Sequence, residues 1–173
     1  MPARNPTRRL VLVRHAKSAR PVGVLDHDRP LSGRGRRDAQ AAGRWMAAEG
    51  PRPDLALCST AVRARQTWEL VSHLLRPVPT RYSDELYGAD AEDLLELVAA
   101  VPPSVRVLVV VGHEPTASVT ALRLAGKRSD RRALEALAEK FPTTGIAVLR
   151  FEGDWPGLPN ARAALETFTV PRG

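Results

Sequence analysis

The 173-residue chain has little that would tie it to a membrane or to an oxidising compartment. It has one cysteine, Cys58, so it cannot form a disulfide within itself, as is usual in a reducing compartment. No apolar run approaches the ~20 residues that span a bilayer. The apolar run after the basic N-terminus is too short for the core of a signal peptide. These absences predict a cytoplasmic protein with no membrane partner.

The sequence also lacks the spacings that bind metals or nucleotides. Its four histidines lie far apart, and no spacing resembles a zinc site or a two-metal site. A Gly-x-x-x-x-Gly-Lys phosphate loop is absent, and Gly33-Arg-Gly35 is too short for a dinucleotide fingerprint. We therefore expect no metal and no other cofactor. Cys58 ends an apolar run without a basic neighbour, so we interpret it as a core residue.

Aromatic residues are scarce, at 5% of the chain, although the formal net charge is +7. Nearly all of the positive charge is arginine, and one interpretation is nucleic-acid binding. The arginines are not interleaved with aromatic residues, as a single-strand platform requires. A solvated, arginine-rich surface is the interpretation that we favour, and we expect no nucleic-acid partner. Some arginines can also clamp an anionic substrate.

What the chain does contain is an alternation of apolar strands and amphipathic helices. Apolar runs predict six strands, at about 10–13, 54–58, 78–82, 105–111, 145–151 and 163–170. Helices are predicted over about 34–48, 61–75, 91–100, 115–125 and 130–140, with Ser32 capping the first and Ser59 or Thr60 the second. The run at 105–111 is typical of a central strand covered on both faces. The pattern predicts a flexible basic tail (1–8) and one three-layer α/β/α domain (9–173) with a mostly parallel sheet.

Polar residues follow three of these strands, at the edge where α/β folds carry their functional loops. Arg14 and His15 follow the first strand, and Arg63 lies one helical turn beyond the second. Gly112 permits a tight bend that leaves His113 at a helix start after the central strand. A neutral imidazole can attack phosphorus near pH 7, and guanidinium groups bind phosphate oxygens. We therefore expect these side chains to meet at one phosphate site.

Taken singly, each of these motifs has a plainer interpretation: a surface Arg-His turn, a solvated arginine paired with an acid, and a histidine that caps a helix. Arg65 fits the plain interpretation better than Arg63, because it lies about 200° further round the helix. His27, in an acidic loop, and His73, within a helix, have no comparable context. We assign no role to either.

Six short motifs follow one another over residues 9–151. They are Leu12-Val-Arg14-His15-Ala16-Lys-Ser18, Asp28-Arg-Pro-Leu-Ser32-x-x-Gly35, Ser59-x-x-x-Arg63-Ala-x-Gln66-Thr67, Asp84-Glu85-Leu86-Tyr87, Val111-Gly112-His113-Glu114-Pro115 and Phe141-Pro-Thr-Thr-Gly145. Each is short, but their order resembles that of the histidine phosphatase superfamily, the phosphoglycerate mutase-like proteins. The likeness is closest to the small phosphohistidine phosphatases of the SixA family.

The resemblance implies a sheet flanked by helices, with at least one antiparallel strand. It implies a metal-independent phosphatase in which His15 is the nucleophile and becomes phosphorylated. Arg14, Arg63 and His113 would surround the phosphoryl group, and Ser18 would contribute to substrate binding. The expected reaction is hydrolysis of phosphate monoesters or of protein phosphohistidine through this intermediate.

The identity of the residue that donates a proton to the leaving group stays open. Glu85 occupies the position at which larger relatives carry their acid, and it is our first candidate. It could equally be a surface carboxylate or the partner of a pocket arginine. Asp26 and Asp28, in the loop after the first strand, are the alternatives. A phosphoramidate is easier to expel than an ester and tolerates a weaker acid.

The substrate is expected to be a phosphorylated small molecule or a protein that bears phosphohistidine. Only about twenty residues separate Thr67 from Tyr87, where larger relatives insert a lid, so the resemblance implies an open pocket. A phosphomutase, which usually needs a closed site, and a non-catalytic phospho-ligand binding protein are the alternatives. Neither the oligomeric state nor the place of Trp155, in the pocket or in the core, follows from the sequence.

Overall fold

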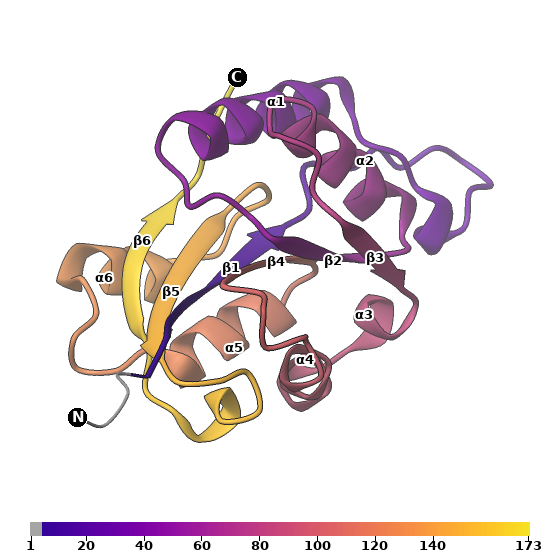
Figure 1. The fold of residues 1–173 in the computed structure, drawn as a ribbon. Coiled ribbons are helices and arrows are strands. Elements are labelled where there is room, and N and C mark those ends of the chain that lie inside the picture. The colour runs from indigo at the N-terminus through magenta and orange to yellow at the C-terminus, as the bar shows by residue number, and fades with distance from the viewer. Residues whose placement is uncertain (1–4) are drawn as a thin grey trace.

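The computed structural model describes residues 5–173, in which a six-stranded sheet lies between two layers of helices (Figure 1). The sheet order is β3-β2-β4-β1-β5-β6, and the strands are β1 (Thr7–Arg14), β2 (Leu55–Ser59), β3 (Thr80–Ser83), β4 (Val107–Gly112), β5 (Ile146–Glu152) and β6 (Ala164–Thr169). Neighbouring strands are parallel from β3 to β1, whereas β5 is antiparallel to both β1 and β6. The predicted α/β fold, mostly parallel with an antiparallel part, is confirmed.

Helices cover both faces of the sheet. α1 (Gly33–Ala48) and α2 (Val62–Ser72) lie on one face, and α4 (Ala91–Ala99), α5 (Thr116–Leu124) and α6 (Arg131–Glu139) lie on the other (Figure 1). Three shorter pieces complete the secondary structure of the described residues: η1 (Asp26–Asp28), α3 (Glu85–Gly88) and η2 (Leu158–Asn160). The three-layer α/β/α arrangement matches the prediction.

The apolar runs of the central strands are continuous because alternate residues face different helical layers. Leu10 and Leu12 of β1 belong to the core beneath α4, α5 and α6. Val11 and Val13 belong to the core beneath α1 and α2. A strand that is buried on both faces has no position left for a polar side chain. Polar residues therefore appear where the strands end.

The helix caps agree with the sequence at one site and differ at another. Ser32 caps α1 as predicted, because its Oγ accepts a hydrogen bond from Gly35 N at 3.0 Å. α2 is preceded by Ala61, which offers no side-chain cap, so the predicted cap at Ser59 or Thr60 is wrong. The hydroxyls of Ser59 and Thr60 instead bond His113 and Asp84.

The boundary predicted between the tail and the domain, after residue 8, does not agree with the start of β1 at Thr7. Residues 1–4 lie outside the described residues, but Thr7 and Arg8 belong to β1, so the tail does not extend to residue 8. Arg8 is buried, and its guanidinium donates to the carbonyls of Pro103, at 2.8 Å, and Gly153. These backbone acceptors bond both Nη groups of a charged side chain inside the fold, while its buried Nε has no partner among the described residues. The basic composition of the segment did not indicate this burial.

Two residues that the sequence left in question belong to the core. Trp155 is fully buried, with its ring centroid 5.3 Å from that of Phe151, and its Nε1 donates to the carbonyl of Val105 at 2.9 Å. Cys58 is buried in β2, and burial raises the pKa of its thiol to about 12. A thiol with so high a pKa is a poor nucleophile at neutral pH, in agreement with the core interpretation.

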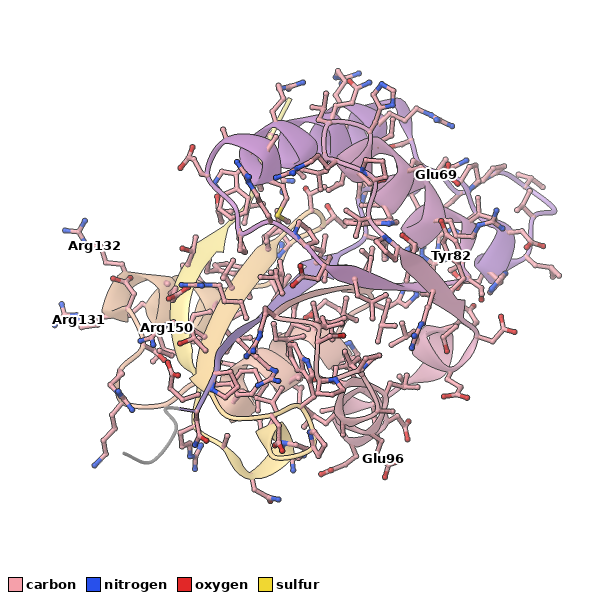
Figure 2. All side chains as sticks on the ribbon, viewed as in Figure 1. Glu69, Tyr82, Glu96, Arg131, Arg132 and Arg150 are labelled. Carbon is pink, nitrogen blue, oxygen red and sulfur yellow. The ribbon has the colours of Figure 1, made fainter. Side chains whose placement is uncertain are left out.

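Part of the positive charge lies on the outer surface. Arg131 and Arg132 of α6 point away from the sheet, as does Glu96 of α4 (Figure 2). Arg131 also pairs with Glu135 one turn further along its helix, at 3.3 Å. Among residues 5–173, no helix is both long enough and apolar enough to cross a membrane.

Candidate active site

The carboxyl ends of β1, β2 and β4 meet at one edge of the sheet. Arg14, the last residue of β1, lies beside Gly112, the last residue of β4. Arg14 and His15 leave β1 at this edge, and His113 leaves β4. Arg63 reaches the same place from the first turn of α2. The parallel register therefore brings together residues that are far apart in the sequence.

A pocket of about 410 Å³ opens at this edge. Its lining residues are Arg14, His15, Lys17, Ser18, Arg20, Arg29, Arg63 and Thr143. Five of these eight side chains are cationic, and in the described part of the chain no carboxylate lines the pocket. His113 stands beside it, with its ring centroid 5.2 Å from that of His15. A pocket of this charge suits a phosphoryl group.

Hydrogen bonds assign the tautomer of His15. Nδ1 lies 2.7 Å from the carbonyl oxygen of Ala16, which can only accept, so Nδ1 carries the proton. Nε2 accepts a hydrogen bond from Arg63 Nε at 3.3 Å. The lone pair of Nε2 therefore faces the arginine-lined pocket.

Both histidines are neutral at physiological pH. Burial lowers the pKa of His15 to about 3, against the opposing effect of the Ala16 carbonyl, and His113 and Arg63 lower it further. Burial, together with Arg63, lowers the pKa of His113 to about 4. Only a neutral imidazole has a free lone pair, so His15 is in the nucleophilic form at pH 7.

The low pKa of His15 predicts a pH-dependent stability. An unfolded histidine has a pKa of about 6.5, so the unfolded chain binds this proton first as pH falls. The contribution of His15 to the free energy of unfolding is complete above about pH 6.5. It is lost as the pH falls toward 3, by up to about 1.4 kcal/mol per pH unit. Urea unfolding between about pH 7.5 and 4.5 should show wild type losing more stability than His15→Asn. Equal losses in the two proteins would contradict a buried, neutral His15.

Arg63 is buried and fixed by the loop that follows β1. Its Nη1 donates to the backbone carbonyl of Asp26 at 2.6 Å, and its Nη2 donates to Asp26 Oδ2 at 3.1 Å. The guanidinium carbon also lies 5.8 Å from the centroid of the Tyr87 ring. These contacts aim Nε of Arg63 at His15, as the position of Arg63 in the first turn of α2 predicted.

Arg14 offers the pocket a donor without a partner. Its Nη1 donates to the carbonyl of Phe141 at 2.8 Å, and its buried Nε has no hydrogen-bond partner among the described residues. A buried N–H without a partner is costly and calls for an explanation. A bound phosphoryl oxygen would satisfy it. Burial also lowers the pKa of Arg14, which indicates that the guanidinium is partly desolvated.

The loop before β5 supports Arg14 and His15 from behind. Thr144 adopts a positive φ of 62°, which is uncommon for a β-branched residue. Its backbone N–H points at the carbonyls of Arg14, at 3.1 Å, and His15, at 3.3 Å. Thr144 is fully buried, so the strain of this turn serves the placement of the two pocket residues.

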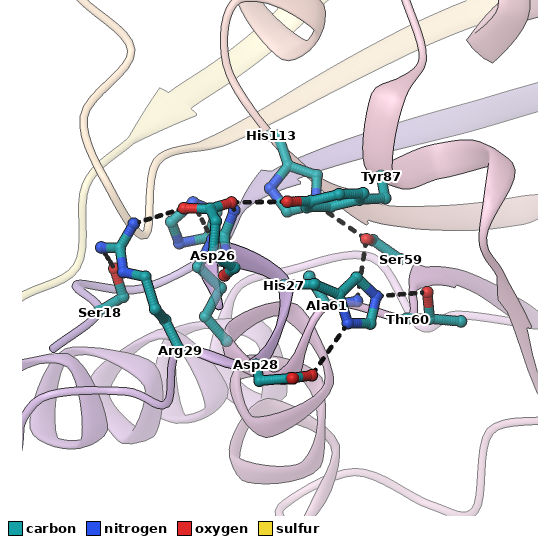
Figure 3. Close-up of polar contacts among 12 residues, drawn as sticks. Ser18, Asp26, His27, Asp28, Arg29, Ser59, Thr60, Ala61, Tyr87 and His113 are labelled. Atoms are coloured by element: carbon teal, nitrogen blue, oxygen red, sulfur yellow. Dashed lines mark hydrogen bonds and ion pairs between the residues drawn. The ribbon is translucent and has the colours of Figure 1, made fainter. Parts of the chain in front are cut away.

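Asp26 is the carboxylate nearest to this group, and it stays ionised. Tyr87 Oη donates to its Oδ2 at 2.7 Å, and Arg29 Nη1 donates to its Oδ1 at 2.8 Å (Figure 3). The hydrogen bonds from Tyr87 and Arg29, helped by Arg63, hold the pKa of Asp26 well below its usual range. An ionised carboxylate cannot donate a proton, so Asp26 orients Arg63 and Arg29 and is a poor general acid.

The other two carboxylates proposed as the acid lie elsewhere. Glu85 is exposed at the start of α3 and lines a separate hollow with Asp93 and Glu96, so the structure does not bring it to the pocket. Asp28 is exposed and lies 3.3 Å from His27 Nδ1. The geometry therefore gives Glu85 no contact with the arginines or with His15.

Several further residues surround the site, and to His27, Ser59 and Thr60 the sequence had given no role in it. The His27 ring lies edge-on to Tyr87, with centroids 4.8 Å apart, and its Nε2 is 3.0 Å from Thr60 Oγ1 (Figure 3). Ser59 Oγ is 2.8 Å from His113 Nε2. Ser18, which the resemblance had implied, lines the pocket and accepts from Arg29 Nη2. His73 is exposed at the end of α2, away from this group.

The Arg63-x-x-Gln66-Thr67 motif connects α2 to both loops of the site. Gln66 Oε1 accepts from the backbone N–H of Leu31 at 2.8 Å, which fixes the end of the loop that carries Asp26. Thr67 Oγ1 accepts from Ala16 N at 2.9 Å and donates to the carbonyl of Arg63 at 2.6 Å. One helical turn thus positions the segment after His15, Arg63 and the loop together.

Gly35 has no room for a side chain, and this predicts a sensitive position. A Cβ at Gly35 would lie 2.0 Å from the carbonyl oxygen of Lys17, in the loop that leaves His15. Gly35→Ala should lower the unfolding free energy by about 1–3 kcal/mol and kcat/KM by roughly tenfold or more, because backbone must move. Gly33→Ala is the matched control, since its nearest neighbour is Arg37 Nη1 at 3.8 Å. Urea unfolding and initial rates check both; equal effects in the two variants would contradict the prediction.

Fold and site together define an α/β protein with an anion pocket of arginines and neutral histidines at the carboxyl edge of its parallel strands. The sequence profile of the histidine phosphatase superfamily (branch 1) matches residues 10–101. An uncharacterized protein of Mycobacterium tuberculosis is 49% identical over 161 residues, which cover 92% of this chain and all of that protein. The chain therefore belongs to the histidine phosphatase superfamily, and it is a phosphatase.

Solved structures agree with this membership. A protein from Nakamurella multipartitia, designated phosphohistidine phosphatase SixA, superposes with a TM-score of 0.86 and is 38% identical, covering 97% of this chain and 98% of its own. Phosphoglycerate mutase from Plasmodium falciparum superposes with a TM-score of 0.63 at 15% identity, covering 98% of this chain and 94% of its own. This second likeness shows the phosphoglycerate mutase-like fold alone.

Proposed function

We propose that this phosphatase hydrolyses protein phosphohistidine by transferring the phosphoryl group to Nε2 of His15 and then to water. The observation that carries the proposal is the orientation of His15, whose protonated Nδ1 is held by the Ala16 carbonyl while Nε2 faces the cationic pocket. Arg14, Arg63 and His113 surround the phosphoryl group, and Ser18 lies at the edge of its site. Nothing in this scheme needs a metal, and we place the reaction in the cytoplasm.

In the first step, Nε2 of His15 attacks phosphorus in line with the leaving group. The N–P bond to His15 forms as the N–P bond to the substrate imidazole breaks, and its electron pair goes to the leaving ring nitrogen. Phosphoryl oxygens take the donors of Arg14 Nε and Arg63 Nε, which frees the lone pair of Nε2. The His15 ring becomes cationic, and the Ala16 carbonyl stabilises it through Nδ1–H.

In the second step, water attacks the phosphorus held on His15. The bond to Nε2 breaks, its electron pair returns to the ring, and inorganic phosphate leaves with the protons of the water. His15 is left neutral, with its proton still on Nδ1. Positioning and charge supply most of the catalysis in such transfers, and the pocket provides both.

The three carboxylates proposed as the acid are poorly suited to that role, and this favours a phosphoramidate over an ester. Asp26 is held ionised, and Glu85 lies in a separate hollow. An alkoxide leaves badly without a proton, and a positioned acid contributes about 10²–10⁴-fold. A phosphohistidine whose other ring nitrogen is protonated departs as neutral imidazole and needs no acid from the enzyme. The pocket therefore fits phosphohistidine better than an alkyl phosphate.

Without a positioned acid, kcat/KM should depend steeply on the leaving group. With free phosphohistidine, an aryl phosphate and phosphoserine as substrates, kcat/KM should fall in that order, with phosphoserine at least about 10²-fold below phosphohistidine. Initial rates of phosphate release in water, without a second acceptor, check this and exclude an obligate mutase. Equal rates on phosphoserine and phosphohistidine would show that an acid operates and would contradict the assignment.

A further inference from the structure

The segment 20–25 belongs to the loop between β1 and η1, which projects from the body of the fold (Figure 1). Arg20, at its start, lines the pocket, and the aliphatic side chains of the segment are exposed. Val22 is fully exposed, Leu25 is 75% exposed and Val24 is 39% exposed. Single exposed aliphatic residues are ordinary on a protein surface. Here three stand within four consecutive positions at the mouth of one site. We call Val22, Val24 and Leu25 the apolar tip.

The loop that carries the apolar tip is well supported. At its base Ala19 N donates to the carbonyl of Pro30 at 2.8 Å, and Ser18 and Leu31 form an antiparallel bridge. Arg29 Nε adds a bond to the carbonyl of Ala19 at 3.0 Å. The fold therefore holds the aliphatic side chains outward, instead of leaving a loose segment that could bury them.

The same loop forms part of the phosphate pocket. Ser18, Arg20 and Arg29 line the pocket, and Asp26, directly after Leu25, bonds Arg63. A phosphorylated side chain that reaches His15 must therefore pass the base of this loop. If that side chain belongs to a protein, the surface around it comes against the apolar tip. A small metabolite inside the pocket would not reach the tip.

The rim carries more positive charge than one phosphoryl group uses. Arg29 and Arg63 both pair with Asp26, at 2.8 and 3.1 Å. Lys17 and Arg20 also line the pocket, are exposed and form no ion pair within residues 5–173. These two cations lie between the pocket and the tip along the chain. The rim therefore suits a partner with acidic residues beside its phosphorylated side chain.

We propose that the apolar tip and the Lys17–Arg20 rim form a docking surface for the protein substrate: an acidic domain with aliphatic residues beside an exposed phosphohistidine. The proposal rests on the proposed function and adds the chemistry of the partner. The phosphohistidine enters the pocket, the acidic residues face Lys17 and Arg20, and the aliphatic residues cover Val22 and Leu25. The tip thus selects phosphoproteins over free phosphohistidine.

Two designed substrates test this proposal. Both are acidic four-helix bundles with one exposed histidine, phosphorylated with phosphoramidate; one has leucines a turn to either side of the histidine, the other serines. Wild type should show a kcat/KM about tenfold higher for the leucine bundle. The double variant Val22→Ser, Leu25→Ser should lose this preference. Its kcat/KM for free phosphohistidine should equal that of the wild type. The matched control is Val119→Ser, Leu122→Ser on α5, where the side chains are 48% and 40% exposed, and it should behave as wild type.

The possible results distinguish failure of the docking surface from failure of the proposed function. If wild type hydrolyses the bundles but the tip variant keeps the leucine preference, or the preference never appears, the docking surface is wrong while the proposed function stands. If the tip variant instead loses only its binding to vesicles of anionic phospholipid, the tip is a membrane contact and the proposal is likewise wrong. Failure of wild type on free phosphohistidine and on both bundles overturns the proposed function and the docking surface together.

Discussion

Replacing His15 with alanine should lower turnover of every substrate by at least about 10⁴-fold, because the phosphoryl acceptor is removed. The pocket should keep its charge, since Arg14 and Arg63 are held by Phe141 and by Asp26 and not by the imidazole alone. The variant should therefore still bind tungstate or phosphate, within roughly tenfold of wild type. Steady-state rates and titration with tungstate measure the two quantities separately.

His73→Ala is the matched control for this experiment. His73 is exposed at the end of α2 and takes no part in the pocket. The His73→Ala variant should keep the kcat/KM and the tungstate affinity of the wild type. If His15→Ala retained more than a few per cent of wild-type activity, with tungstate affinity intact, another group would have to accept the phosphoryl group and the covalent scheme would be wrong.

The second large effect is expected at Arg63. Arg63→Ala removes the donor that faces Nε2 of His15, and it also removes one of the two arginines that pair with Asp26, which then keeps only Arg29 and Tyr87. Loss of one well-placed donor to an oxyanion costs about 10²–10³-fold, or about 2.7–4 kcal/mol. We expect kcat/KM to fall at least that far, with a smaller change in the unfolding free energy. Arg63→Lys should recover only part of the lost kcat/KM, because an ammonium group lacks the planar, forked donors of a guanidinium.

Arg65→Ala is the matched control for Arg63. It lies two residues further along α2 and is exposed, and its guanidinium carbon is 5.7 Å from the Tyr82 ring, outside the pocket. It should leave kcat/KM within about twofold of wild type. Equal losses in the two variants, or an Arg63→Ala enzyme as active as wild type, would contradict the role given to Arg63.

Arg14, His15, Arg63 and His113 could be brought together from the sequence because their positions follow from the backbone. Each lies at the carboxyl end of a strand that an apolar run marks clearly, or within a few residues after it. In a parallel sheet those ends share one edge, so strand assignment alone places the side chains. The order and parallel direction of the strands are thus enough to predict the centre of the site.

The surroundings of the site could not be predicted in this way. Asp26 and Tyr87 meet only because the loop after β1 folds back over α2, and this depends on hydrogen bonds such as Leu31 N to Gln66 Oε1. Glu85 was expected near the pocket, but the short α3 turns it outward and presents Tyr87, two residues later, to Asp26. Side-chain direction in a four-residue helix is set by tertiary packing and leaves no periodic signal. Gln66, one residue before the end of the Arg63-x-x-Gln66-Thr67 motif, was the available hint that this loop packs on α2.

The ionised state of Asp26 is the consequence of the structure that bears most on chemistry. The sequence offered three carboxylates as acids, and their types alone do not distinguish them. The structure separates them by their contacts: Asp26 accepts from Tyr87, Arg29 and Arg63. Asp28 lies against His27, and Glu85 lines a separate hollow. For this reason we propose phosphohistidine, and not phosphate monoesters in general, as the substrate.

Trapping the phosphorylated enzyme tests the central claim most directly. Wild type is mixed with free phosphohistidine carrying a labelled phosphoryl group, quenched in alkali within the first turnover, digested and read by mass spectrometry and phosphorus NMR. The account predicts label on Nε2 of His15, formed and lost at rates that match turnover. Full turnover with no label on His15, or label on another residue of the pocket, would contradict it.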